Sequence, residues 1–303
     1  MNFFPNSSEE ISLIKFIAKY QYLAVNDAKY FFSTVKYFRK RITRLVEQRY
    51  LKRNKLMLVL DEIGIEYAKE KGYEYNPVNR NQKYLSRLLY ISNFGAYYEK
   101  SEKIEFTPSF SIKDKEMLTL KSRKYIGIIN ISGYEYLIYH ISKIHDYKYI
   151  RSVIYDIQKE LKYKNTIILI EPGVKLNIND FIFGNGQVLI IEDTEENRNK
   201  LQDLNNIRWV DIVYKLYHGK AHLAGYKFCD YTDYKHKYIS YFYFFDTEKI
   251  NRIKQFLAEN KFKGMDILCP KEIKEELQKQ IPKANYIIVD VKDYIDGKKK
   301  EDE

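Results

Sequence analysis

The stretch TVKYFRKRITRLVEQRYLKRNKLMLVL, residues 34–60, decides how the N-terminal part of this chain folds. Ser33 or Thr34 can cap a helix that runs to about residue 49. Its apolar residues recur at three- and four-residue spacing, which is typical of one buried helix face. They are Val35, Phe38, Ile42, Leu45 and Val46. Residues 50–53 and 56–60 then flank a small turn at Asn54 and Lys55, which predicts a two-stranded hairpin.

Positive charge is concentrated in the same stretch. Residues 34–55 contain nine Lys or Arg and one acid, a net charge of +8, whereas the whole chain of 303 residues carries +11. A solvated helix face normally mixes both signs, and a one-sided basic surplus indicates contact with a polyanion. The side chains that we expect to contact double-stranded DNA are Lys36, Tyr37, Arg39, Lys40, Arg41, Thr43, Arg44, Lys52, Arg53 and Lys55.

A basic amphipathic helix can lie in the major groove, which is about 12 Å wide, while its apolar face stays in the core. The residues expected near base edges or groove walls are Lys36, Tyr37, Lys40 and Arg44. Those expected mostly at phosphates are Arg39, Arg41, Arg53 and Lys55.

Two helices are expected before the basic one. Ser8 is followed by two acids, so it is expected to cap a helix that ends near residue 20. Asn26 or Asp27 caps a short second helix to about residue 32. After the hairpin, Asp61 caps a further helix, which Gly72 closes.

The order helix, short helix, basic helix, hairpin and helix resembles winged helix-turn-helix domains over about residues 8–75. In those domains a Leu-Thr-x-x-Gly segment leads from the hairpin, or wing, into the next helix. Here residues 60–64, LDEIG, occupy that place with Asp61 instead of Thr, and Asp can cap a helix as Thr does. The resemblance implies an α+β DNA-binding domain over residues 1–76.

The rest of the chain has a different pattern of expected helices and strands. Residues 77–123 are expected to form a connecting helix over 79–98 and then a polar loop or weak strand. In residues 124–296 we expect a hairpin across Gly133 and helices over 147–162, 195–204 (capped by Thr194) and 247–260. Strands are expected at 166–173, 187–193 and 236–246. A strand-helix-strand unit over 265–291, whose two strands pair in parallel, is expected to finish the domain. This pattern predicts a mixed α/β sheet domain, followed by a frayed tail over residues 297–303.

This layout is similar to the plasmid replication-relaxation proteins of Gram-positive mobile elements, in which a restriction-nuclease-like sheet follows the DNA-binding domain. The resemblance implies a cytoplasmic regulator of transcription, or a replication or transfer accessory protein, of a plasmid, phage or conjugative element. Its sheet domain, possessing a degenerate nuclease-like fold, would serve structure or assembly.

The alternative is a metal-dependent DNA-nicking or DNA-cleaving enzyme with an atypical site in residues 124–292. Such nucleases hold a divalent metal through acids beside a lysine, typically Pro-Asp followed later by Asp/Glu-x-Lys. The chain contains no Pro-Asp. Asp-x-Lys tripeptides begin at Asp146, Asp233 and Asp290, and of these only the last falls on a predicted strand.

Other candidate sites are weaker. His218 and His222 have the spacing of a helical metal pair, but Gly219 argues against a helix there. Glu192 and Asp193 form an acidic pair, although a helix start explains them better. We therefore expect no catalytic residue, no bound metal and no cofactor.

A third interpretation is a protein-interaction scaffold whose basic helix is incidental. The helix over residues 79–98 could also support a homodimer. The sequence has no run of about 18 apolar residues, so we expect no membrane span. Its first residues do not show a basic segment followed by an apolar one, so we expect no signal peptide. Cys229 and Cys269 have no CxxC partner, which fits a reducing compartment and no zinc cluster.

Overall fold

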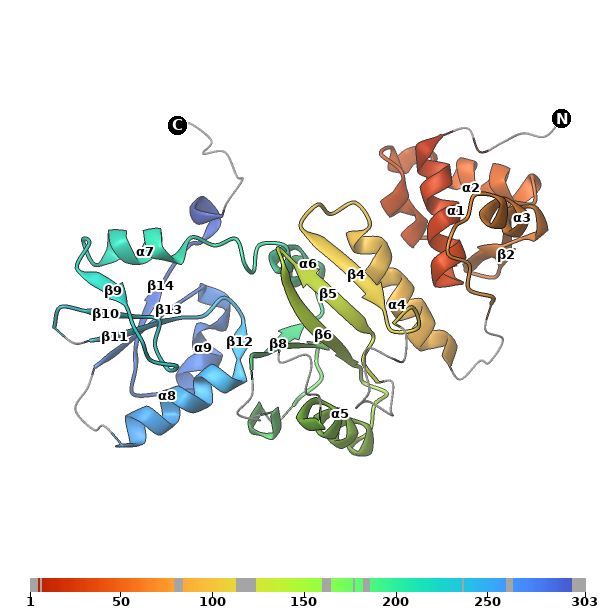
Figure 1. The fold of residues 1–303 in the computed structure, drawn as a ribbon. Helices are drawn as coiled ribbons and strands as arrows, with labels where there is room; N and C mark the ends of the chain where they lie inside the picture. Colours follow the sequence, from red (N-terminus) through yellow and green to blue (C-terminus); the bar gives the residue numbers. More distant parts are fainter. Residues whose placement is uncertain are drawn as a thin grey trace. The chain divides into compact units, whose positions relative to one another are not determined.

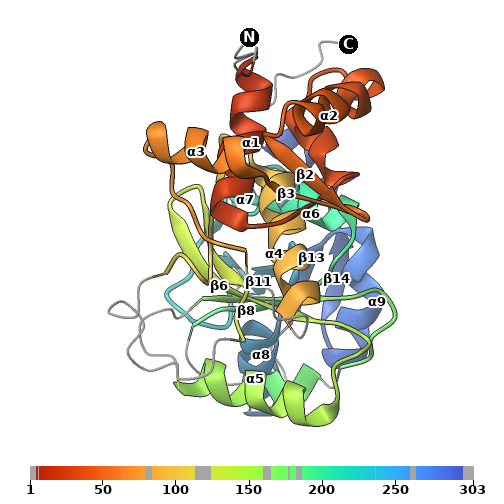
Figure 2. The same cartoon turned by 90° about the vertical axis from the view of Figure 1, so that its right-hand side faces the viewer.

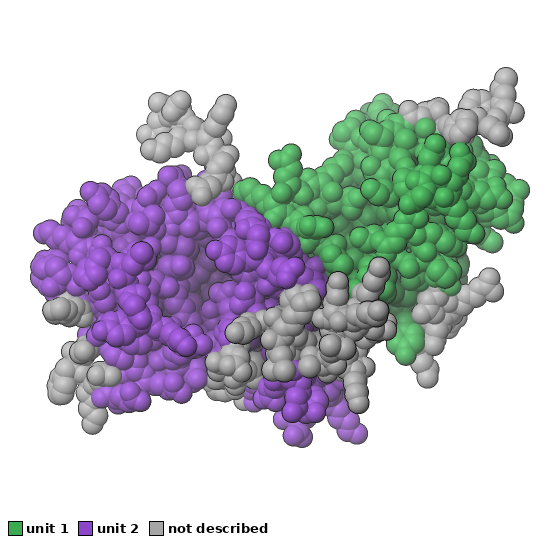
Figure 3. Space-filling model, in the orientation of Figure 1, with its two compact units in different colours: residues 1–112 green, residues 113–303 purple. Residues whose placement is uncertain are grey.

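The computed structural model describes residues 5, 7–78, 84–112, 124–159, 165–176, 178–181, 186–235, 237–259 and 264–295. The chain divides into two compact units, Met1–Ile112 and Lys113–Glu303 (Figure 3). Both units combine helices with sheets, which confirms the expected mixture of α and β structure. Parts of six expected elements lie outside the described residues, namely 79–83, 113–122, 160–162, 236, 260 and 297–303.

The first unit contains the basic helix and the hairpin (Figure 1). Its elements in chain order are α1 (Ser8–Tyr20), β1 (Leu23–Ala24), the 3-10 helices η1 (Asp27–Phe31) and η2 (Val35–Tyr37), α2 (Phe38–Glu47), β2 (Leu51–Asn54), β3 (Met57–Leu60), α3 (Glu62–Glu70), α4 (Leu85–Tyr98) and β4 (Ile104–Pro108). Strand β1 pairs with β3, so the small sheet has the order β1-β3-β2. Helix α4 packs on α1, β1 and η1, which makes it part of this unit.

Three local features differ by a residue or a turn from the sequence expectation. The cap of α1 is Ser7, whose Oγ accepts the Glu10 N–H, and not Ser8. The basic segment starts as a 3-10 turn because Thr34 makes no side-chain capping bond, and regular α-helix begins only at Phe38. The hairpin turn lies at Lys55 and Leu56, one residue later than expected, and Lys55 has a φ of 54°.

Two glycines allow elements of the first unit to approach closely. A Cβ on Gly64, the last residue of the LDEIG segment, would lie 2.0 Å from the backbone oxygen of Tyr50. A Cβ on Gly95 of α4 would lie 2.7 Å from the ring of Tyr20 on α1. Neither position has room for a larger residue, so α3 packs directly on the start of the hairpin and α4 directly on α1.

The second unit contains two sheets. Within the unit, the first has the order β12-β8-β7-β6-β5, with β6, β7 and β8 parallel. The bounds are β5 (Gly127–Ile131), β6 (Tyr134–Ile141), β7 (Thr166–Ile170), β8 (Val188–Glu192) and β12 (Phe245–Asp246). The hairpin between β5 and β6 is confirmed, because Ser132 and Gly133 form its two-residue loop with φ of 52° and 89°. Helix α5 (Tyr147–Lys159) runs beneath this sheet in both ribbon views (Figures 1 and 2).

The second sheet has the order β14-β13-β11-β10-β9. Its strands are β9 (Ala221–Leu223), β10 (Tyr231–Asp233), β11 (Tyr238–Tyr241), β13 (Met265–Cys269) and β14 (Asn285–Ile288), and its helices are α7 (Trp209–Leu216), α8 (Thr247–Glu259) and α9 (Lys271–Gln280). The expected parallel pairing of the last two strands is confirmed. Helix α7 and strands β9 and β10 were not expected.

One expected strand is wrong. Residues 236–246 do not form a continuous strand, because β11 belongs to the second sheet and β12 to the first. Between them Phe242, Tyr243 and Phe244 are buried without strand geometry. An unbroken aromatic run has no alternation to show where the chain leaves a sheet. Residues 242–244 are therefore a connecting segment between the two sheets.

Candidate nucleic-acid interface

Helix α2 presents one exposed polar face. Arg39, Lys40 and Thr43 are exposed on it, at spacings that bring their side chains to one side of the helix. The Thr43 hydroxyl donates to the backbone oxygen of Arg39 at 3.0 Å. Lys36 and Tyr37, in the preceding 3-10 turn, are exposed as well. The opposite face is buried through Phe38, Ile42 and Leu45, so the separation of basic and apolar faces is confirmed.

The hairpin carries the second group of predicted contacts. Lys52, Arg53 and Lys55 are all exposed. The Arg53 Nε donates to the backbone oxygen of Lys55 at 3.1 Å, which ties the side chain to the turn. Leu56 at the same tip is also exposed.

Helix and hairpin meet at one concave surface. A hollow of about 480 Å³ lies between α2, the hairpin tip and the loop that follows β1. Its lining residues are Ala24, Val25, Asn26, Arg39, Ile42, Thr43, Arg53 and Leu56. No acid is among these described lining residues, so the guanidinium groups of two elements share a basic, partly apolar recess. Sequence reasoning missed Asn26 and Leu56, because nothing local links them to the helix.

Two predicted DNA contacts have partners inside the unit. Arg41 forms an ion pair with Glu9 and lies 3.4 Å from the Ser7 hydroxyl. Glu9 also accepts the Ser33 backbone N–H at 2.7 Å, and this bond, followed by smaller contributions that include Arg41, lowers its pKa. Thus Arg41 and Glu9 tie the start of α1 to the segment that leads into α2.

Arg44, the other paired residue, is directed at Glu10. The two side chains form an ion pair in which the carboxylate is 1% exposed and the arginine 42% exposed. The acids of the first turn of α1 thus have a second role besides favouring the helix N-terminus, and this role was not foreseen from the sequence. Arg49, outside the predicted set, pairs similarly with Glu62.

The remaining predicted cations differ from Arg41 and Arg44. Within the part of the chain that the structure describes, they form no ion pair with a carboxylate. They are Lys36, Arg39, Lys40, Lys52, Arg53 and Lys55. Among the described residues, six cations of η2, α2 and the hairpin therefore have no carboxylate partner.

The Asp-x-Lys tripeptides have local structural roles. The carboxylate of Asp146 accepts the Tyr149 N–H at 2.8 Å and caps α5. Asp233 accepts the backbone N–H groups of residues 235 and 237, both at 2.8 Å. Asp290 accepts the N–H of Lys292 at 3.1 Å and lies beyond the end of β14, so its expected place on a strand is wrong. Asp is favoured at such turns because its side chain bonds nearby backbone.

The other candidate acids and histidines also have structural roles formed with nearby residues. Asp193 forms a two-bond ion pair with Arg198, at 2.7 and 2.9 Å, while Thr194 caps α6 (Glu195–Leu201) as expected. His222 lies on β9 and contacts Thr232 across the strand pair at 2.9 Å, so it shares no helix with His218. Among the described residues, no three His, Cys, Asp or Glu side chains are grouped to hold a metal ion.

Among the helices of the described ranges, none is both long and apolar enough to cross a lipid bilayer. Comparison with protein-family models, curated proteins and solved structures found no match to this chain.

Proposed function

We propose that this protein binds double-stranded DNA in a sequence-directed manner through helix α2 and the β2–β3 hairpin. The observation that carries the proposal is the shared hollow, in which Arg39 and Thr43 of the helix face the same space as Arg53 of the hairpin. A basic helix and a basic hairpin on one surface can contact a groove and its flanking phosphates together.

The element order supports a winged helix-turn-helix assignment for the N-terminal part of this unit. Helix α1, the short η1 and the basic α2 are followed by a hairpin whose strand β3 also pairs with β1. In this proposal α2 enters the major groove and the hairpin is the wing. Tyr37 and Thr43 face base edges, while the six cations without a carboxylate partner among the described residues, Arg39 and Arg53 included, neutralise flanking phosphates.

Arg41 and Arg44 have a different part in the proposal. Their ion pairs with Glu9 and Glu10 fix the orientation of α2 on α1. They act as positioning residues, so their loss should disturb the fold of the unit more than the contact with DNA.

The test is a selection from a random duplex pool followed by affinity measurements on the enriched site. The variant Arg39→Gln/Arg53→Gln should bind about 100-fold more weakly, because each lost contact contributes about 1–3 kcal/mol. Lys69→Gln is the matched control, since Lys69 is an exposed cation on α3 of the same unit and does not line the hollow. Equal losses in both variants would overturn the assignment of the interface.

We further propose that the protein is a regulator or a replication or transfer accessory protein of a mobile element. This role rests on the resemblance in layout and on the basic interface. Sequencing the genomic fragments that the protein retains tests it, because a site beside an origin or promoter supports the role. Nicking of supercoiled plasmid in the presence of Mg²⁺ would contradict a purely binding role.

A further inference from the structure

A second hollow lies in the Lys113–Glu303 unit, where the chain passes from one sheet to the other. It has a volume of about 250 Å³. Six of its lining residues are aromatic: Tyr134, Trp209, Tyr241, Phe242, Tyr243 and Phe244. Small-molecule sites are typically concave and aromatic, with a few placed polar groups. The proposed DNA-binding function uses none of these residues.

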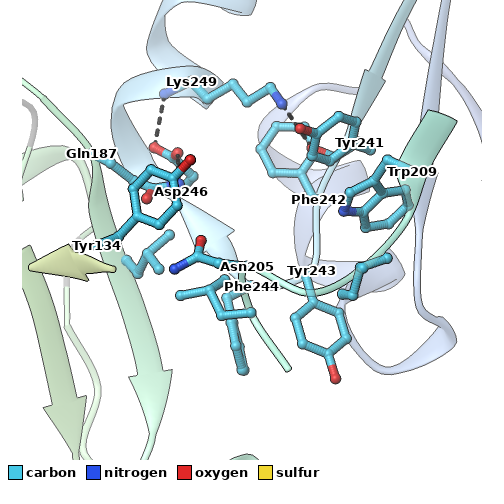
Figure 4. A pocket seen from close by; sticks show the side chains of 13 residues that line it. Tyr134, Gln187, Asn205, Trp209, Tyr241, Phe242, Tyr243, Phe244, Asp246 and Lys249 are labelled. Carbon is cyan, nitrogen blue, oxygen red and sulfur yellow. Dashed lines mark hydrogen bonds between the residues drawn. The ribbon is translucent and has the colours of Figure 1, made fainter. Parts of the chain in front are cut away.

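The aromatic side chains form two sides of the hollow (Figure 4). Trp209 and Tyr241 lie on one side and stack on each other, with ring centroids 4.4 Å apart and planes 11° apart. Tyr134 lies on the other side, near Asp246 and Gln187. The Tyr134 side chain is 57% exposed, although most of the other rings are buried. Trp209 covers one face of the Tyr241 ring, so the exposed Tyr134 ring is the one on which a planar ligand can stack.

Four polar residues line the hollow, namely Gln187, Asn205, Asp246 and Lys249, and of these Asp246 is the carboxylate. This residue is 8% exposed, and burial raises the pKa of its carboxyl group. One oxygen accepts the Lys249 backbone N–H at 3.1 Å, and the other accepts the Gln187 side-chain amide at 3.1 Å. A carboxylate can accept about four hydrogen bonds, so both oxygens retain capacity for donors from a ligand.

Lys249 covers one face of the Tyr241 ring. Its ammonium pairs with Asp230 and donates to the backbone oxygen of Tyr241 at 2.8 Å. It also lies 4.3 Å from the centre of the Tyr241 ring. A cation therefore already occupies this face of Tyr241, and Asp230 balances its charge. The Asp246 carboxylate is left to interact with a ligand, so the arrangement favours a planar ring that carries N–H donors.

We propose that this hollow binds a guanine base, with its ring stacked on Tyr134 and its N1–H and amino N–H groups donating to Asp246. Guanine offers two adjacent donors, which match the two oxygens of a carboxylate. Adenine and cytosine place an acceptor beside the amino group, and that acceptor would face a carboxylate oxygen. The base can come from a free nucleotide or from an unpaired position in single-stranded nucleic acid.

Trp209 is the only tryptophan of the chain, so its fluorescence reports directly on this hollow. Titration of the full chain with GMP should give saturable quenching, and AMP and CMP should bind about ten-fold more weakly because they lack the paired donors. A thymidine oligonucleotide with one guanine, compared with the same oligonucleotide without it, distinguishes the two sources. Binding of either guanine form supports the proposal.

Variants separate recognition from folding. Asp246→Asn keeps a residue that caps α8 well but places an N–H donor opposite the base, so the preference for guanine should disappear. Tyr134→Ala should weaken binding about ten-fold through lost stacking. Tyr155→Ala is the matched control, because Tyr155 is 58% exposed and lies outside the hollow.

Three results would overturn the assignment. The first is the absence of quenching by GMP and by the guanine oligonucleotide. The second is equal quenching by all three nucleotides, or an unchanged guanine preference in Asp246→Asn. The third is quenching by choline in place of guanine, which would show a cation site.

Discussion

The ion pair between Arg44 and Glu10 gives the sharpest stability prediction for the first unit. The Glu10 side chain is 1% exposed, and its carboxylate forms an ion pair with the arginine that reaches it from α2. Removing one partner of a buried pair typically costs about 3–5 kcal/mol, because the other charge remains buried. The Arg44 side chain is 42% exposed, and water can partly replace it. We therefore expect Arg44→Met to lower the free energy of unfolding by about 2 kcal/mol.

Repeating the Arg44→Met substitution in a Glu10→Gln variant separates the effect of the ion pair from the effect of losing the arginine side chain. In Glu10→Gln no buried carboxylate is left, so adding Arg44→Met should cost less than about 1 kcal/mol. Urea unfolding followed by far-UV circular dichroism measures both differences. Trp209 lies in the second unit, and its fluorescence transition should stay unchanged in all variants. An equal cost of Arg44→Met in both backgrounds would show that the ion pair contributes nothing.

Two further predictions concern one residue in each unit. Gly64→Ala should lower the free energy of unfolding of the first unit by more than about 2 kcal/mol, because the new Cβ would clash with the Tyr50 backbone oxygen. Urea unfolding followed by circular dichroism measures this loss, and an unchanged unfolding transition would contradict the prediction. Burial lowers the pKa of His140 to about 4, whereas an unfolded histidine titrates near pH 6.5. Between these values only the unfolded chain takes up the proton, so stability should fall by about 2–3 kcal/mol as the pH drops from about 6.5 to 4. Trp209 fluorescence during urea unfolding at each pH measures this loss, and His140→Gln should flatten the profile; an unchanged profile in that variant would refute the cause.

Much of the fold follows from local sequence patterns. The apolar spacing of α2, the hairpin after it and the β5–β6 turn each depend on residues that are close in the chain. The LDEIG segment also marks a real constraint, since Gly64 has no room for a side chain. These elements could be predicted because periodicity and turn chemistry are local.

Other features depend on contacts between distant residues. Glu9 and Glu10 resemble ordinary first-turn acids, and their arginine partners lie more than thirty positions away. Sequence spacing could not show which cations of α2 are paired and which are left for a ligand. The aromatic hollow is made by one tryptophan, one hairpin tyrosine and a passage between sheets that has no periodic pattern. Strands as short as β9 and β10 carry too few residues for any period to be recognised.

The salt dependence of duplex binding tests the central claim most directly. Six cations of the helix and hairpin make no ion pair within the described residues, so the logarithm of the affinity should fall with the logarithm of the salt concentration at a slope of about −5. The Arg39→Gln/Arg53→Gln variant should show a slope of about −3.5, and Lys69→Gln, outside the hollow, should remain near the original value. A slope near zero, or no retention of any duplex at low salt, would contradict the account.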